Sequence, residues 1–187
     1  QAVNENDLMF PLTFGARGSA TIGGVLSTNA GGSNVLKYGN TRDLVLGVEI
    51  VLPNGDIMNL MSELHKDNSG YCLRDLVIGA EGTLGIITQA VLKLFPKPKA
   101  HATAMVAVKS LDHALALLNE LQEGTGGAVA AYEYMPKRYI QGYMELSSSS
   151  RKPFQKDYDH LVMIELETTV ELFSRSTDDG QVLLSGE

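Results

Sequence analysis

Two glycine-rich stretches hold the residues of this sequence whose types and spacing could do chemistry. The first is Ala20–Gly32 (ATIGGVLSTNAGG), and the second is Ile78–Thr88 (IGAEGTLGIIT). Glycines have no Cβ, so a ligand or another backbone segment can approach them closely. Within the first stretch, Ser27–Asn29 supply short hydrogen-bond donors and acceptors. This composition suits a large flat ligand, and a glycine-rich helix packed tightly against a sheet is the alternative interpretation.

Apolar and acidic residues within the two stretches sharpen that choice. In the first stretch Ile22, Val25 and Leu26 can anchor the segment in a core. In the second, the carboxylate of Glu81 stands between turn glycines and leads into an apolar strand. A bulge at the start of a strand explains this pattern as well as a ligand site does. One carboxylate does not make an acid–base pair, so no catalytic residue is assigned.

Several common catalytic patterns are absent from the sequence. It contains no G-x-G-x-x-G turn, no G-x-x-x-x-G-K-[ST] loop and no G-x-S-x-G elbow. The 4 histidines are widely spaced, so no metal site is predicted. His113 is expected to be solvated. The single cysteine, Cys72, shows no evident basic partner in the sequence and is expected to be a buried, inert thiol.

Composition indicates an ordinary globular chain of one domain or two small ones. The 187 residues are 44% hydrophobic and 20% charged, with a net charge of −7 that argues against nucleic acid. No apolar run approaches the ~20 residues that span a bilayer, and the N-terminal decapeptide does not resemble a signal peptide. One cysteine excludes a disulfide framework and fits a reducing compartment. We expect a cytoplasmic protein, peripheral to a membrane only through an electron acceptor.

The first half of the chain predicts the elements that would carry the two stretches. These are a short helix in Gln1–Phe10, an extended segment at Phe10–Arg17, a helix capped by Ser19 or Thr21, a loop at Val35–Thr41, a hairpin within Asp43–Leu60, a loop at Lys66–Tyr71, a helix at Leu73–Val77 and a strand at Leu84–Phe95. Asn54–Gly55 between alternating apolar residues is a strong hairpin signal, because both residues tolerate positive φ. Leu84–Phe95 is apolar on both faces, which predicts a strand deep in a sheet.

A change in composition at Pro96–Lys99 (PKPK) predicts a domain boundary, with domains at 1–97 and 98–187. Beyond it, the expected elements are strands at Thr103–Lys109, Val129–Tyr134 and His160–Leu166, a helix capped by Ser110 and ended by Gly124 and Gly126–Gly127, a helix at Pro136–Leu146 and a loop at Ser147–Lys152. The first helix is expected to carry Leu111, Leu115 and Leu118 on one face, its apolar face. This order begins an α+β sandwich. Thr169–Glu187 lacks periodicity and is expected to be loop or frayed.

Three stretches taken together resemble one family. They are Phe10–Gly32 (FPLTFGARGSATIGGVLSTNAGG), Lys37–Gly55 (KYGNTRDLVLGVEIVLPNG) and Gly70–Thr88 (GYCLRDLVIGAEGTLGIIT). They are similar to the FAD-linked oxidases of the vanillyl-alcohol oxidase type, which have a PCMH-type FAD-binding domain. The most similar branch is that of the D-2-hydroxyacid dehydrogenases, which includes glycolate oxidase, D-lactate dehydrogenase and D-2-hydroxyglutarate dehydrogenase. The resemblance is strong from Phe10 to about Lys99 and weaker beyond.

The resemblance implies an α+β fold: the second subdomain of a PCMH-type FAD-binding domain, followed by the start of a ferredoxin-like α+β cap domain. It also implies non-covalent FAD, bound through backbone N–H groups and small side chains, with Ile86 and Ile87 against a ring. The implied cofactor-binding residues are Gly15, Ala16, Arg17, Gly18, Ser19, Ala20, Thr21, Gly23, Gly24, Thr28, Asn29, Ala30, Gly31, Glu81, Gly82, Thr83, Leu84, Gly85, Ile86 and Ile87.

The implied activity is oxidation of a D-2-hydroxy acid of the glycolate, D-lactate or D-2-hydroxyglutarate class by hydride transfer to flavin. The electron acceptor is unnamed, and a homodimer is left open. Two alternatives are a non-catalytic structural or FAD-binding module and a flavin enzyme of the alkyl-glycerone-phosphate synthase type. The family's P-G-R-G-G phosphate loop and H-x-G-D-G-N site are both absent. We therefore expect an internal fragment, inactive alone, whose FAD is bound by the full-length parent.

Overall fold

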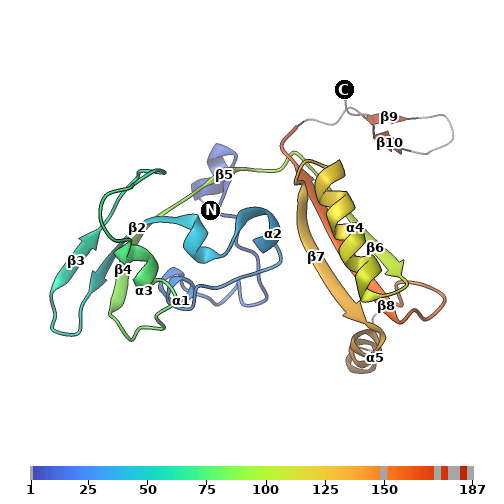
Figure 1. Cartoon of the computed structure of the whole chain (residues 1–187), viewed down its shortest axis with the longest axis horizontal. Coiled ribbons are helices and arrows are strands. Elements are labelled where there is room, and N and C mark those ends of the chain that lie inside the picture. The colour runs from blue at the N-terminus through green and yellow to red at the C-terminus, as the bar shows by residue number, and fades with distance from the viewer. Residues whose placement is uncertain (1, 148–150, 171–173, 177–181, 185–187) are drawn as a thin grey trace. The chain divides into compact units, whose positions relative to one another are not determined.

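The chain folds into two compact units, residues Gln1–Pro96 (unit 1) and Lys97–Glu187 (unit 2). A computed structural model describes residues 2–147, 151–170, 174–176 and 182–184 (Figure 1). Helices and strands are mixed in both units, so the α+β expectation is confirmed. None of the helices in the described part of the chain combines the length and the apolar character that crossing a lipid bilayer requires.

Unit 1 is built on a three-stranded antiparallel sheet in the order β3-β2-β4. Its elements are η1 (Ala2–Asn6), β1 (Leu8–Met9), α1 (Ile22–Ser27), α2 (Val35–Tyr38), η2 (Thr41–Leu44), β2 (Val45–Val51), β3 (Ile57–Leu60), α3 (Leu73–Val77), β4 (Ile86–Leu92) and β5 (Phe95–Pro96). A separate short pair joins β1 to β5. The first glycine-rich stretch, Ala20–Gly32, therefore contains α1, and the second, Ile78–Thr88, leads into β4.

The predicted hairpin forms as expected between β2 and β3. Gly55 takes a φ of 90°, which a residue without Cβ adopts at no steric cost, and its amide donates to the Leu52 carbonyl at 2.9 Å. Antiparallel pairing then runs from Val51 opposite Ile57 to Val48 opposite Leu60. The turn residues thus fix the register of this pair.

The core of unit 1 lies between one face of the sheet and the short helices α1 and α3. Its fully or nearly fully buried residues are Leu26, Val45, Val48, Ile50, Val77 and Ile78. The central strand is β2, whereas β4 is an edge strand with Ile86 70% exposed. The prediction that Leu84–Phe95 lies deep in the sheet is therefore wrong. Apolar residues on both faces did not distinguish a central strand from an edge strand, and β2 occupies the centre.

Three smaller expectations for unit 1 are also corrected. The segment Val35–Thr41, expected as a loop, contains the helical turn α2. The expected N-terminal helix is the 3-10 helix η1, and it gives way to strand β1 before Pro11. Of the three proposed anchors in the first glycine-rich stretch, Val25 and Leu26 are buried, but Ile22 is 46% exposed because it begins the helix on its outer side.

Unit 2 is a three-stranded antiparallel sheet, β6-β8-β7, with α4 lying across one face (Figure 1). Its elements are β6 (Ala100–Val108), α4 (Leu111–Gly124), β7 (Val129–Pro136), α5 (Lys137–Leu146), β8 (His160–Thr168), β9 (Ser174–Ser176) and β10 (Val182–Leu184). The strands and helices predicted before Thr168 are confirmed. Ser110 caps α4 as expected, because its Oγ accepts from the His113 amide at 3.3 Å.

The buried face of α4 differs from the predicted one. Ala114 is 2% exposed, and it packs with Leu117 and Leu121 against the sheet. Leu111 and Leu115 are instead 53% and 54% exposed. The reason is the small size of Ala114, which lets the helix approach the sheet closely at that point. The hydroxyl of Tyr132 on β7 donates to the Ala114 carbonyl at 2.5 Å and fixes this rotation of the helix.

The segment Thr169–Glu187, expected to be loop or frayed, contains the antiparallel pair β9–β10, with Leu183 opposite Arg175. That expectation is wrong for these two short strands. The other parts of the segment at 171–173, 177–181 and 185–187 lie outside the described residues, as does 148–150 within the expected loop Ser147–Lys152.

Candidate functional site

Helix α1 lies within the first glycine-rich stretch, and the second stretch is hydrogen-bonded to its C-terminal end. The side chain of Thr21 caps its start, accepting a hydrogen bond from the Gly24 amide at 3.3 Å. Before it, residues 15–19 form an exposed turn in which the Ala20 amide donates to the Ala16 carbonyl at 2.9 Å. Of the two residues predicted as the cap, Ser19 and Thr21, it is Thr21 that caps this helix. Residues 15–20 therefore lie on the surface, and the chain first reaches the core at Val25 and Leu26 in α1.

The second glycine-rich segment meets α1 at its other end. The amide of Gly79 donates to the Leu26 carbonyl at 3.0 Å, and the amide of Glu81 donates to the Ser27 carbonyl at 2.8 Å. These bonds satisfy carbonyls at the end of the helix that have no partner within it. The segments Thr28–Gly31 and Glu81–Ile87, predicted from the sequence to serve one ligand, are thus neighbours in the structure.

Left-handed backbone conformations gather where the two segments meet. Asn29 has a φ of 46°, and Glu81 has a φ of 51° between Gly79 and Gly82, which are at 91° and 77°. Asparagine tolerates this region, but a glutamate there costs about 1–2 kcal/mol. The Thr83 hydroxyl helps to hold the turn by donating to the Ala80 carbonyl at 2.6 Å. Strain of this kind is concentrated at functional turns in proteins.

The predicted glycines fall into open and packed positions. A Cβ added at Gly15, Gly18 or Gly82 would meet no atom within 4 Å. A Cβ at Gly85 would lie 2.7 Å from the Val51 carbonyl oxygen, and one at Gly31 would lie 2.9 Å from Oδ1 of Asn40. The packed glycines therefore serve the fold. The open ones leave a smooth exposed surface that a flat ligand such as FAD can approach, so the residues present fit that group.

A groove of about 260 Å³ runs along the first segment at the start of α1. Its lining includes Phe10, Phe14, Arg17, Ala20, Thr21, Ile22 and Val25. Its lining combines two aromatic side chains, Phe10 and Phe14, with one cationic side chain, Arg17, which suits an anionic group attached to a flat apolar one. No residue of Glu81–Ile87 lines this groove. The predicted segments Gly15–Thr21 and Glu81–Ile87 therefore lie at opposite ends of α1.

Most predicted cofactor-binding residues are accessible. The exposed ones are Gly15, Ala16, Arg17, Gly18, Ser19, Ala20, Thr21, Gly24, Thr28, Gly31, Glu81, Gly82, Thr83, Leu84 and Ile86; the half-buried ones are Gly23, Asn29, Ala30 and Ile87. Gly85 is buried. Among the apolar members, Ile86 is free to contact a ring, whereas Ile87 packs against the core of unit 1.

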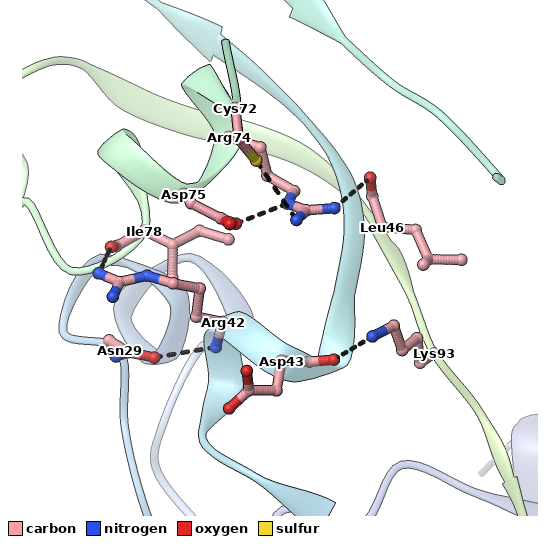
Figure 2. Close-up of polar contacts among 9 residues, drawn as sticks. All are labelled: Asn29, Arg42, Asp43, Leu46, Cys72, Arg74, Asp75, Ile78 and Lys93. Atoms are coloured by element: carbon pink, nitrogen blue, oxygen red, sulfur yellow. Dashed lines mark hydrogen bonds and ion pairs between the residues drawn. The ribbon is translucent and has the colours of Figure 1, made fainter. Parts of the chain in front are cut away.

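A polar pair that the sequence interpretation missed lies between the two segments. The hydroxyl of Thr41, a fully buried residue, donates to the Ala30 carbonyl at 2.6 Å. The backbone amide of Arg42 donates to Oδ1 of Asn29 at 2.9 Å, and its guanidinium Nη2 donates to the Ile78 carbonyl at 2.6 Å (Figure 2). The only sequence signal for these contacts was that Thr41 and Arg42 stand between a turn and a buried strand.

A second arginine organises the start of α3. The guanidinium of Arg74 donates to Asp75 at 2.8 Å, to the Leu46 carbonyl at 3.0 Å and to the sulfur of Cys72 at 3.4 Å (Figure 2). Burial raises the pKa of Asp75, but hydrogen bonds from Arg74 and Cys72 and the charges of Arg74 and Arg42 outweigh it, so that the pKa lies below its usual value. The carboxylate is therefore held ionised.

Two expectations about Cys72 are wrong. The thiol is exposed rather than buried, and it has a basic neighbour, because the side chain of Arg74 folds back over the start of α3. Cys72 precedes the helix at the position before its first turn, outside the core. In the ranges that the structure describes, no group of three or more histidine, cysteine, aspartate or glutamate side chains could hold a metal ion. His113 is exposed, as predicted.

Comparison with known proteins agrees with this geometry. Residues 1–61 match the family described as the FAD binding domain. The whole chain is 33% identical to a D-2-hydroxyglutarate–pyruvate transhydrogenase of Saccharomyces cerevisiae, of which it covers 39%. Over 74% of its length it is 41% identical to the mitochondrial D-2-hydroxyglutarate dehydrogenase of Rattus norvegicus, of which it covers 26%. Among solved structures, an alkyldihydroxyacetonephosphate synthase superposes on 89% of the chain with a TM-score of 0.69 and 21% identity, and the match covers 32% of that protein.

Residues 1–61 therefore match an FAD binding domain, whose cofactor is FAD, and the chain shares the fold of the solved synthase. Homologues of the chain include proteins named as D-2-hydroxyglutarate dehydrogenases, which confirms the resemblance drawn from the three sequence stretches. The chain spans about two fifths of the length of the first of these relatives and about a quarter of the second.

Proposed function

We propose that this chain is part of an FAD-dependent oxidoreductase that oxidises a D-2-hydroxy acid. One observation carries the proposal. Residues 1–61, which match the FAD binding domain, contain α1, and the carbonyl of its last residue, Ser27, accepts a hydrogen bond from the Glu81 amide. Thr28–Gly31 and Glu81–Ile87, two of the three segments predicted to contact FAD, are thereby held close together. The names of the relatives support a 2-hydroxy acid as the substrate class.

Three groups of residues are proposed to hold FAD. Gly15–Thr21 offers an open turn beside the groove that contains Arg17, Thr28–Gly31 continues from α1, and Glu81–Ile87 supplies the strained turn and the exposed side chain of Ile86. FAD, when bound, supplies the two-electron acceptor. The residues of this chain contribute position and shape, and none of them is assigned as the catalytic base.

The two units are proposed to have different roles. Unit 1 corresponds to the second FAD-binding subdomain, and unit 2 corresponds to the first part of the cap domain. The partner substrate is a small molecule of the glycolate, D-lactate or D-2-hydroxyglutarate class, and the electron acceptor is not assigned. A cytoplasmic location, with peripheral membrane association through that acceptor, belongs to the same proposal. The likeness to alkyldihydroxyacetonephosphate synthase shows the fold alone, so that chemistry is not proposed.

The test is anaerobic reduction of the flavin in the longer protein that we propose contains this chain. We expect D-2-hydroxyglutarate, D-lactate or glycolate to bleach the flavin absorbance near ~450 nm, in a 1:1 ratio of substrate oxidised to flavin reduced. L-2-hydroxyglutarate is the matched control. A purified protein without flavin that does not take up FAD would contradict the proposal, as would flavin that none of the three acids reduces.

A further inference from the structure

Arg42 connects the two glycine-rich stretches, Ala20–Gly32 and Ile78–Thr88, through two different parts of the residue. Its backbone amide donates to Oδ1 of Asn29 at 2.9 Å. Its side chain reaches the other segment, where Nη2 donates to the Ile78 carbonyl at 2.6 Å (Figure 2). A substitution at position 42 keeps the first bond and removes the second. The role of the side chain can therefore be separated from that of the backbone.

The peptide unit between Ile78 and Gly79 is held at both of its polar atoms. Its carbonyl accepts from the Arg42 guanidinium at 2.6 Å, and its N–H donates to the Leu26 carbonyl at 3.0 Å. The guanidinium also fits closely, because a Cβ added at Gly79 would lie 3.0 Å from Nη2 and 3.2 Å from the Cβ of Asn29. Rotation of this peptide plane would break both bonds, so its orientation is fixed.

That peptide sets the direction of the turn that follows. Gly79 adopts a φ of 91°, and Glu81, two residues on, adopts a φ of 51°. A left-handed glutamate persists only where the surrounding structure determines it. The Ser27–Glu81 bond determines it from one side. The Arg42–Ile78 bond fixes the chain immediately before the turn. An arginine suits this task, because its planar guanidinium loses less freedom for each hydrogen bond than an ammonium does.

We propose that Arg42 is a positioning residue for FAD, which fixes the orientation of the Ile78–Gly79 peptide and so the placement of Glu81–Ile87 beside Thr28–Gly31. This inference rests on the proposed function. Arg42 lies outside the segments expected to contact the cofactor, and it acts through the backbone that leads directly into Glu81–Ile87. Sites of this kind lose affinity when the shell that supports the contact residues is loosened.

The experiment compares Arg42→Met with Arg42→Lys and with Arg74→Met. The last is the matched control, because Arg74 also donates to a backbone carbonyl, that of Leu46, but at the start of α3. Hydrogen exchange of the Gly79 and Glu81 amides is measured in the 187-residue chain without flavin. The Kd for FAD is measured by flavin fluorescence in the longer protein.

We expect Arg42→Met to speed exchange at both amides by about tenfold and to raise the Kd for FAD by about tenfold. Arg42→Lys, which keeps a donor, is expected to recover about half of each change on a logarithmic scale. Arg74→Met should leave both quantities within about twofold of wild type.

Other outcomes overturn the inference. Faster exchange in Arg42→Met with an unchanged Kd would show that Arg42 supports only the fold. A weaker Kd with unchanged exchange would remove the proposed mechanism, and equal effects from Arg74→Met would show a general loss of stability. If the wild-type longer protein does not bind FAD, the proposed function fails and the flavin role of Arg42 fails with it. The exchange data would then report only on the turn.

Discussion

The Ser27 carbonyl accepts a hydrogen bond from the Glu81 amide at 2.8 Å, and this bond fastens the end of α1 to the second glycine-rich turn. It also explains how Glu81 keeps a φ of 51°, a conformation that side chains with a Cβ rarely adopt. The hydrogen bond to Ser27, a residue far from Glu81 in the sequence, thus offsets the backbone strain at Glu81. The balance can be measured by substitution.

Replacing Glu81 with glycine is expected to stabilise the chain relative to Glu81→Ala by about 1 kcal/mol. Both variants lose the carboxylate, but only glycine adopts the left-handed region without steric cost. Thermal and urea unfolding of the two variants measure the difference. Equal stabilities would mean that the turn relaxes when the glutamate is removed, and that the strain assigned to Glu81 is not stored in the native backbone.

Substitutions at two glycines separate cofactor approach from packing. A Cβ at Gly18 would meet no atom within 4 Å, so Gly18→Ala should leave the free energy of unfolding within about 0.5 kcal/mol of wild type. The Kd for FAD in the longer protein is expected to rise by about tenfold, because the methyl group occupies the proposed contact surface.

The matched variant is Gly32→Ala. A Cβ there would overlap the Thr13 carbonyl oxygen, so the fold should lose about 2 kcal/mol or more. Urea unfolding checks both variants. If Gly18→Ala leaves FAD binding unchanged, the turn at Gly15–Ser19 does not face the cofactor.

The thiol of Cys72 should react in the folded chain. It is exposed at the start of α3, so one equivalent of an aromatic disulfide reagent should be consumed without denaturant, at a rate within about tenfold of that in the unfolded chain. Mass spectrometry would locate the label on the peptide that contains Cys72. If Cys72 is labelled only after unfolding, the thiol is buried, as the sequence predicted, and not exposed.

Asp75 should make the stability of unit 1 depend on acid pH. Its pKa in the folded chain lies below the ordinary value of 3.8. The stabilisation it provides is therefore complete above that value and is lost as the pH falls through the lower folded value. The side chain is 37% exposed, so solvent screening limits the effect to about 0.5 kcal/mol.

The measurement is the difference in free energy of unfolding between wild type and Asp75→Asn, which should shrink as the pH falls from about 5 to about 2. Raising the salt concentration should shrink it as well. A difference that stays constant across this range would assign the contribution of Asp75 to hydrogen bonds that asparagine also makes.

The 187-residue chain alone is expected to show no saturable micromolar binding of FAD in flavin fluorescence and calorimetry. The reason is that the sequence lacks the P-G-R-G-G loop that the family resemblance implies for binding the pyrophosphate. The longer protein is the positive control. Micromolar binding by the chain would show that its two glycine-rich segments form a usable site by themselves.

Local signals predicted much of the fold. Asn54–Gly55 marked its hairpin, although only Gly55 takes the positive φ that both residue types tolerate. Thr21 and Ser110 specified helix starts because a short side-chain oxygen can reach an unpaired helix amide. Such signals depend only on neighbours in the sequence.

What the sequence did not predict depends on distant partners. Whether β4 lies at the centre or the edge of a sheet depends on β2 and β3, and which face of α4 is buried depends on Tyr132. The same holds for Arg42, whose partners Asn29 and Ile78 are far from it in the chain. The glycine-rich segments themselves were predicted, since their composition marks them, but the groups that hold them were not.

The three-stranded sheet of unit 1 has two edges, β3 and β4, and within the described residues neither strand has a partner on its outer side. Ile57 on β3 and Ile86 on β4 lie opposite Val51 and are about two thirds exposed, at 68% and 70%. Open edges of this kind accept further strands without rearranging those already paired. The sheet is therefore a template that can grow in either direction. A purified preparation of the chain should be handled at low concentration, because the same edges invite association between copies.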